Sequence, residues 1–273
     1  MVFAPASLIL TNYHLPLSEA LCNSGVIVTF EKTRKGNPLE LVIDQHFHTA
    51  HAIAKFYHND GKVVVLEKDS GETFKRHKRA KIFCAKRNWD ERAERGYMTT
   101  IESNFHSQID NLVSFQERDH KAISEYFALW RLRHKFHLGR IPNAPLAGIQ
   151  GENLSKEQQE VLEKNGVGFV NEHAEIPARQ LTGTQIQIGV MGLMKTTFSE
   201  MKWGLLKAKK GQFLCADGYQ ELCLIPVSPK FVLAENLGDK TLDYNEVALV
   251  NKQSVESATQ FYFAKSLQSC PVA

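Results

Sequence analysis

The apolar residues of this chain change their spacing twice along its length. Short β-branched runs bounded by turn residues come first, helical spacing follows in the middle, and short apolar runs return in the last third. Grouped strands and grouped helices, rather than strict alternation of the two, are typical of the α+β class. We therefore predict an α+β fold in which a mixed β-sheet, made of hairpins and C-terminal strands, packs against a mostly antiparallel helical region.

Two hairpins are predicted in the first part of the chain. GVIVTF, KGNP and LELVID indicate strand, turn and strand between Ser24 and Ile43. Helical spacing predicts a short helix over Gln45 to Phe56. A second hairpin begins with a strand over Lys62 to Leu66 and turns at Asp69-Ser70-Gly71. The two hairpins could share one sheet.

The middle and the end of the chain predict further helices and strands. Apolar positions from Thr99 and from about Arg118 indicate two antiparallel helices. A capped helix is expected at KEQQEVLEK, and a longer one from about Ile176 through IGVMGLMKTTFSEMKWGLL. GQFLCAD, with a strand over Phe213 to Ala216, then ELCLIPVSP and KFVLAEN predict strands. DYNEVALVNKQSVESATQFYFAKS predicts a closing helix.

Composition limits the class of protein. With 273 residues, 43% of them hydrophobic, the chain suits one large domain over residues 1–273. No run approaches the roughly 18 apolar residues of a membrane span, so we expect a cytoplasmic protein without membrane contact. The five cysteines are scattered and odd in number, which indicates reduced, mostly buried thiols.

A basic segment lies between Lys75 and Arg87. KRHKRAKIFCAKR holds seven Lys or Arg among thirteen residues and no acid, whereas the net charge of the whole chain is +3. Such a cluster creates a positive field that attracts phosphates, and Lys75, Arg76, Lys78 and Arg79 are the expected contacts. The alternative is a solvated surface beside the acidic segment that follows.

Four segments match, in order, the motifs of a known bacterial family. Gln45-His46-Phe47-His48-Thr49, followed by the Asn59-Asp60-Gly61 turn, corresponds to a His-His-x-x-Pro opening and an Asp-Gly turn. Glu102 corresponds to a helical glutamate, and the segment from Phe127 to Arg133 to a helix of the form F-x-A-L-Q-x-x-R. The segment from Phe213 to Tyr219 corresponds to a strand ending in Ser-Asp-Asn-Pro.

Over residues 45–265 the chain resembles the bacterial domain of unknown function numbered forty-two thirty-eight. Residues 1–44, with the N-terminal hairpin, lie outside the match. The second histidine of the opening is His46, and Asp217 is the aspartate of the strand end. Gln45, Thr49 and Trp130 depart from the family pattern, as does Gly218-Tyr219, so the chain resembles a divergent member.

Histidines 46, 48 and 51 form the first candidate site. On a helix, His48 and His51 would share one face, and two imidazoles on one face can bind a transition metal. A closed zinc site needs about four ligands, however, and no carboxylate is close in sequence. His46 is therefore predicted to be a general base or a hydrogen-bonded histidine at the start of the helix.

Three other polar residues have functional and structural interpretations. Glu102 follows Ile101 at the edge of an apolar helix face, where burial would raise a carboxyl pKa, or it is an exposed helical glutamate. Arg133 could hold phosphate, or it is one of several cations at a helix C-terminus. Asp217 follows an apolar strand directly and could be a site residue or an Asx-turn before Gly218.

Two functions follow from these residues. The first is a hydrolase of a phosphate-bearing substrate, such as a nuclease or nucleotide hydrolase of a bacterial defence or conflict system. His46 would be the base, Glu102 and Asp217 acids or ligands of Mg²⁺ or Mn²⁺, and Arg133 the anion clamp, with these four residues around one concave site. Substrate would contact Lys75, Arg76, Lys78, Arg79 and Arg131. The second function is a non-catalytic ligand- or nucleic-acid-binding or sensor module. No P-loop, dinucleotide motif, nucleophile elbow or HExxH motif is present.

Overall fold

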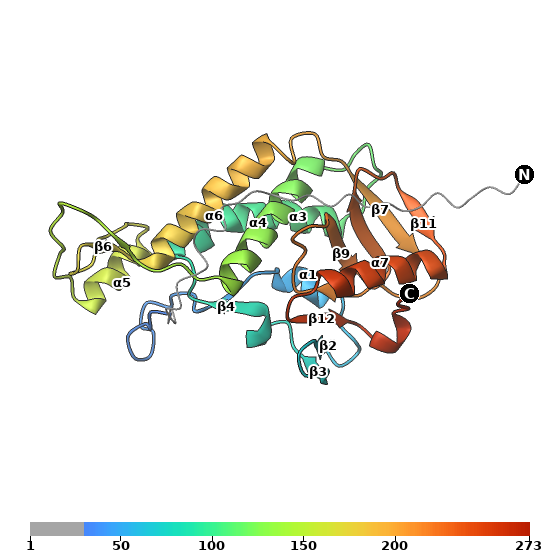
Figure 1. Cartoon of the computed structure of the whole chain (residues 1–273), viewed down its shortest axis with the longest axis horizontal. Helices are drawn as coiled ribbons and strands as arrows, with labels where there is room; N and C mark the ends of the chain where they lie inside the picture. Colours follow the sequence, from blue (N-terminus) through green and yellow to red (C-terminus); the bar gives the residue numbers. More distant parts are fainter. Residues whose placement is uncertain (1–29) are drawn as a thin grey trace, which may run out of the picture.

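A computed structural model describes residues 30–273, and it confirms the α+β class (Figure 1). The helices are α1 (Ala50–Ala54), α2 (Glu91–Ala93), α3 (Thr99–Asp110), α4 (His120–Leu138), α5 (Lys156–Lys164), α6 (Ala178–Lys195) and α7 (Tyr244–Ser257). The strands are β1 (Asp44–His46), β2 (Val63–Glu67), β3 (Thr73–Arg76), β4 (Cys84–Lys86), β5 (Ala144–Pro145), β6 (Glu175–Ile176), β7 (Trp203–Ala208), β8 (Cys215–Ala216), β9 (Leu224–Ser228), β10 (Phe231–Glu235), β11 (Lys240–Leu242) and β12 (Phe261–Ala264). None of the helices in this range is long and apolar enough to cross a membrane.

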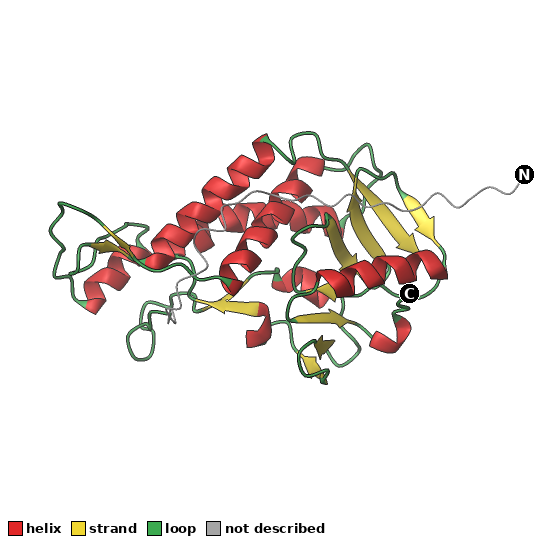
Figure 2. Ribbon diagram, in the orientation of Figure 1, coloured by secondary structure: helices red, strands yellow, loops and turns green. Residues whose placement is uncertain are grey.

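Two four-stranded sheets are present rather than one (Figure 2), and β1 with β4 and β5 with β6 form separate two-stranded sheets. One has the order β11-β7-β10-β9 and is mixed, because β11 pairs with β7 in parallel and the other pairs are antiparallel. The other has the order β3-β2-β12-β8 and is antiparallel. Helix α7 lies between the two sheets in Figure 1 and contacts β8 of one and β11 of the other.

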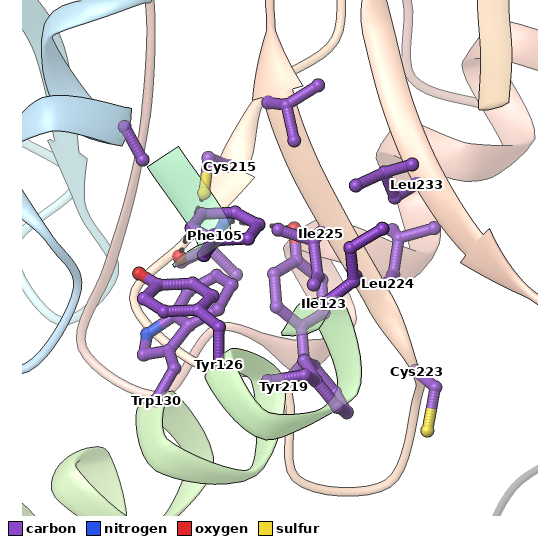
Figure 3. Close-up of a cluster of buried hydrophobic side chains, with 14 of the residues drawn as sticks. Phe105, Ile123, Tyr126, Trp130, Cys215, Tyr219, Cys223, Leu224, Ile225 and Leu233 are labelled. Carbon is purple, nitrogen blue, oxygen red and sulfur yellow. Dashed lines mark hydrogen bonds between the residues drawn. The ribbon is translucent and has the colours of Figure 1, made fainter. Parts of the chain in front are cut away.

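Helix α4 lies at the centre of the helical region, with α3 and α6 packed against it. Asp119 caps its start by accepting a hydrogen bond from the backbone N–H of Ala122. Most of the helix is buried around its circumference, as expected for a helix inside a core. Phe105 of α3 stacks on Tyr126 with ring centroids 3.7 Å apart, and Trp130 lies in the same cluster, edge-on to Tyr219 (Figure 3).

The first predicted hairpin is wrong over the residues that the structure describes. Residues 24–29 lie outside them, and residues 30–43 form turns and irregular chain. Asn37 and Glu40 both have positive φ, at 48° and 51°, and the Asn37 side chain bonds the backbone of Leu41 at both N–H and carbonyl. This compact turn replaces the second strand. The strand that does form, β1, pairs with β4 and not with the second hairpin.

Three other predictions are confirmed wholly or in part. The helix expected over Gln45 to Phe56 is present as the shorter α1, because Gln45 is in β1 and its buried side chain bonds the backbone of Asn88 and Trp89. The second hairpin is confirmed as β2 and β3. The strand expected over Phe213 to Ala216 is confirmed for its second half, β8.

Two predicted helices end earlier than expected. Helix α6 stops at Lys195, and the WGLL segment that was assigned to it belongs to β7, an inner strand of its sheet. Helix α7 stops at Ser257, and Phe261–Ala264 form β12 between β2 and β8. In both segments, pairing with strands distant in sequence outweighs the local helical spacing. The capped helix α5 is confirmed, with a capping box at Ser155.

The cysteines agree with the prediction of reduced, buried thiols. Cys84, Cys215, Cys223 and Cys270 are free and buried, and Cys22 lies outside the described residues. Burial raises the pKa of the Cys84 thiol to about 12, so this thiol is protonated and unreactive at neutral pH.

Candidate functional site

Arg133 is the centre of a polar group beside α4. Its guanidinium donates from Nη1 to Glu102 Oε1 at 2.5 Å, and Nη2 lies 3.7 Å from Glu94 Oε2. Nε points at the Met98 sulfur, 3.4 Å away, and the Arg133 side chain is 1% exposed. Burial by itself lowers the pKa of Arg133, but the charges of Glu102 and Glu94 outweigh it and raise the pKa. All three nitrogens therefore already have partners.

His46 lies at the edge of this group, at the end of β1. Its Nε2 is 2.8 Å from the carbonyl oxygen of Lys78, so Nε2 carries the proton and Nδ1 keeps its lone pair. Burial lowers the pKa of His46, and the charges of Glu102 and Arg133 act on it more weakly. A neutral imidazole with a free lone pair has the form that a general base needs. The structure thus brings together His46, Glu102 and Arg133.

Glu94 completes the group, and the sequence did not indicate it. It precedes the kink at Gly96 that separates α2 from α3, and it accepts a hydrogen bond from Trp89 Nε1. Burial raises the pKa of Glu94, although Arg133 opposes the shift. From the sequence alone, Glu94 is one of several acidic residues in the segment that follows the basic segment. Its partner Arg133 lies on another helix, so no local spacing could reveal the pair.

Asp217 belongs to a different polar group. Its Oδ1 accepts from the N–H of Thr259 at 2.8 Å, and its Oδ2 accepts from the N–H of Gln260 at 2.7 Å and of Phe261 at 3.4 Å. The same oxygen lies 3.4 Å from His134 Nε2, and neither side chain is exposed. His134 and Arg133 are neighbours on α4, where consecutive side chains point about 100° apart. One helix therefore carries two separate polar groups on different faces.

The role of Asp217 in the structure is local. Its carboxylate holds the connection between α7 and β12 against the end of β8. Gly218 is required by the packing, because a Cβ there would lie 2.2 Å from His134 Nδ1. With three backbone N–H groups bound to its two oxygens, Asp217 is a satisfied buried carboxylate.

The basic arm, which we define as Lys75, Arg76, Lys78 and Arg79, borders the Arg133 group through the Lys78 carbonyl. Lys75, Arg76 and Arg79 are exposed and Lys78 is half-buried. Lys75 forms an ion pair with Asp60 at 2.7 Å, and the Arg76 guanidinium lies 4.0 Å from the Phe74 ring centroid. In the described chain no carboxylate pairs with Arg76, Lys78 or Arg79.

Arg131 does not lie with the basic arm. Its side chain is buried against Phe127, 5.6 Å from the ring centroid, and donates to the backbone carbonyl of Gln220. Burial lowers the pKa of this arginine. Arg131 was expected to contact substrate beside the arm, but its guanidinium packs inside the protein against the turn that contains Gln220.

The predicted histidine pair does not form a metal site in the structure. His48 precedes α1, is buried, stacks on Trp130 with centroids 4.0 Å apart, and accepts from the Tyr126 hydroxyl at Nδ1, 2.8 Å away. His51 lies at the surface and bonds Asp110 at 2.8 Å. Within residues 30–273, no three His, Cys, Asp or Glu side chains are grouped so that they could hold a metal ion.

Comparison with known proteins gives no relative. No family model matches the chain, and no match was found among the curated proteins or the solved structures. The resemblance to the bacterial domain of unknown function therefore stays a prediction, and the function has to be argued from the site.

Proposed function

We propose that this protein is a cytoplasmic binding module for nucleic acid, which it contacts through the basic arm without hydrolysing it. The observation that carries the proposal is the exposure of three arm cations, together with the absence of any carboxylate partner for Arg76, Lys78 and Arg79 in the described chain. Unpaired surface cations repel one another, and a polyanion relieves that repulsion and releases counterions. A bacterial defence function, and membership of the family that the chain resembles, belong to the same proposal.

The expected catalytic residues favour binding over hydrolysis. Arg133 was to clamp a phosphate, but its nitrogens are used by Glu102, Glu94 and Met98. Asp217 was to bind a metal or donate a proton, but its oxygens accept backbone hydrogen bonds. A catalytic acid or clamp needs free atoms that face the substrate. The arm has such atoms at the surface, whereas those of Arg133 and Asp217 are used inside the protein.

Titration of labelled single-stranded RNA and DNA, followed by fluorescence anisotropy, tests the proposal. The variant Lys75→Gln, Arg76→Gln, Lys78→Gln, Arg79→Gln should weaken binding of both. It should also reduce the slope of log K against log salt by about 3, since each phosphate contact on a single strand contributes roughly 0.7. Measurement from about 50 to 200 mM salt gives this slope.

A matched control removes four exposed lysines on another surface. Lys202, Lys207, Lys209 and Lys210, changed together to glutamine, alter the net charge by the same amount and lie on or near β7. This control should keep most of the affinity and the slope. Equal losses in both quadruple variants would assign binding to net charge alone, and an unchanged isotherm in the arm variant would remove the arm from the proposal.

A hydrolase is the second candidate, and one observation favours it. His46 is neutral at pH 7 with Nδ1 free, and the arm's Lys78 carbonyl fixes its orientation. Incubation of RNA, DNA and nucleotides with the protein, with and without Mg²⁺ or Mn²⁺, would detect turnover. Product formed by the native protein and abolished by His46→Gln, with folding intact, would replace the binding proposal by this one.

A further inference from the structure

A pocket lined by three arginines lies where the end of β4, the chain after α4 and the start of α6 meet. Arg87, Arg140 and Arg179 line it, together with Glu31, and its empty volume of about 380 Å³ includes the part open to solvent. Arg87 is the last residue of the basic segment, yet its side chain is 1% exposed. The pocket is therefore built from interior guanidinium groups and does not belong to the basic arm.

Two of these arginines share a single interior carboxylate. Glu163 Oε2 accepts from Arg87 Nη2 at 2.6 Å and from Arg179 Nε at 2.7 Å. Arg87 Nε and Arg179 Nη2 are buried and have no hydrogen-bond partner among residues 30–273. Burial raises the pKa of Glu163 to about 7, and even when fully ionised this carboxylate supplies one negative charge against two guanidinium groups. A buried N–H without an acceptor costs free energy until an acceptor arrives.

Arg140 adds a third cation without a counter-charge. Within residues 30–273, its polar contact is one hydrogen bond from Nη2 to the carbonyl of Lys86, at 2.6 Å. Burial lowers the pKa of Arg140, and no ion pair joins Arg140 to a carboxylate within the part of the chain that the structure describes. Half-buried guanidinium groups that lack a carboxylate are typical of anion sites, because their planar donors suit phosphate and carboxylate oxygens.

Glu31 occupies the open side of the pocket. Its carboxylate contacts Arg179 and also Lys156 of α5, and its side chain is 40% exposed. Among the residues that line the pocket, the three arginines outnumber the one carboxylate, Glu31, and Glu163 is shared behind them by Arg87 and Arg179. Of the two carboxylates, Glu31 is the one that can move into solvent, since Glu163 is 2% exposed.

We propose that this pocket binds a small oxyanion of the phosphate class, held by Arg140, Arg87 and Arg179, and that Glu31 is a built-in competitor which the anion displaces. The anion would provide the acceptors that Arg87, Arg140 and Arg179 lack. The same chemistry fits free inorganic phosphate and the phosphate of a nucleotide. This proposal does not depend on the nucleic-acid proposal, because the two use different residues.

Isothermal titration with inorganic phosphate, and separately with a nucleoside monophosphate, tests the pocket. Tighter binding of the nucleotide would identify it as the source of the phosphate, and equal binding would assign the pocket to the free anion. Glu31→Gln should tighten binding about tenfold if the pair with Arg179 closes the pocket roughly nine-tenths of the time. Arg140→Gln should reduce the affinity at least tenfold while the protein stays folded, because Arg140 makes no ion pair that the fold needs.

Glu157→Gln is the matched control. Glu157 pairs with Arg34 at 3.0 Å on α5 and does not line the pocket, so its loss should leave phosphate binding unchanged. Lack of heat with both the native protein and Glu31→Gln at millimolar phosphate would overturn the site. Equal affinity of those two proteins would overturn the competitor role. The basic-arm variant should bind phosphate like the native protein, so failure of one proposal is distinguishable from failure of the other.

Discussion

Replacing Asp217 by Asn tests whether this carboxylate stabilises the fold. The substitution keeps the size of the side chain and removes its charge and one acceptor oxygen. Whichever way the amide is oriented, its NH₂ group faces a backbone N–H, that of Thr259 or that of Gln260. One short hydrogen bond to a charged group is lost, and two donors then oppose each other in a site without solvent.

The magnitude follows from these contacts. A hydrogen bond to a charged group contributes about 1.5–3 kcal/mol, and a buried donor left without an acceptor costs about 1–3 kcal/mol. We expect Asp217→Asn to lower the free energy of unfolding by about 3 kcal/mol, allowing for partial relaxation of the exposed Thr259 and Gln260. For a chain of this size, that corresponds to roughly 6–12 °C in Tm.

Urea unfolding followed by circular dichroism measures this difference. Asp69→Asn is the control, because Asp69 lies exposed in the β2–β3 turn and the same change there should stay within about 0.5 kcal/mol. If Asp217→Asn unfolded like the native protein, the structural role of Asp217 would be refuted. A folded variant that lost a measured hydrolytic activity would return Asp217 to the list of catalytic candidates.

Two further predictions concern the interior of α4 and its neighbours. Arg133→Met should lower the free energy of unfolding by about 3 kcal/mol, because Glu94 and Glu102 lose their counter-charge; an effect below about 1 kcal/mol in urea unfolding would contradict this. Burial lowers the pKa of His48 to about 3, far below its ordinary 6.5, so the unfolded chain takes up a proton first as the pH falls. His48 should therefore lower the free energy of unfolding as the pH falls from 6.5 towards 3, by up to about 1.4 kcal/mol per pH unit. The variant His48→Asn can still accept a hydrogen bond from Tyr126 and should make this decline with pH less steep.

Elements whose signals are local were predictable from the sequence. The β2–β3 hairpin follows from β-branched runs around an Asp-Ser-Gly turn, and α5 follows from its capping box. Helix α4 follows from its apolar spacing, and the structure adds the Asp119 cap. In each element, a few neighbouring residues determine the backbone conformation and need no distant partner.

Tertiary structure decided which polar groups meet. The sequence identified the candidate residues His46, Glu102, Arg133 and Asp217. On α4, however, Arg133 and its neighbour His134 point in different directions. Arg133 therefore contacts Glu102, whereas His134 contacts Asp217. The sequence identified the basic segment as well, but packing divides that segment into an exposed arm and the interior Arg87.

The same holds for strands β7 and β12, whose residues are assigned to helices by local spacing. Each is an inner strand with partners distant in sequence. The sequence by itself thus determined the fold class, the local hairpins and caps, and the polar residues available. Which strands pair and which charges are buried depends on contacts between residues far apart in the chain. Local sequence patterns do not reveal these contacts, because they form and contribute to stability only when the chain folds.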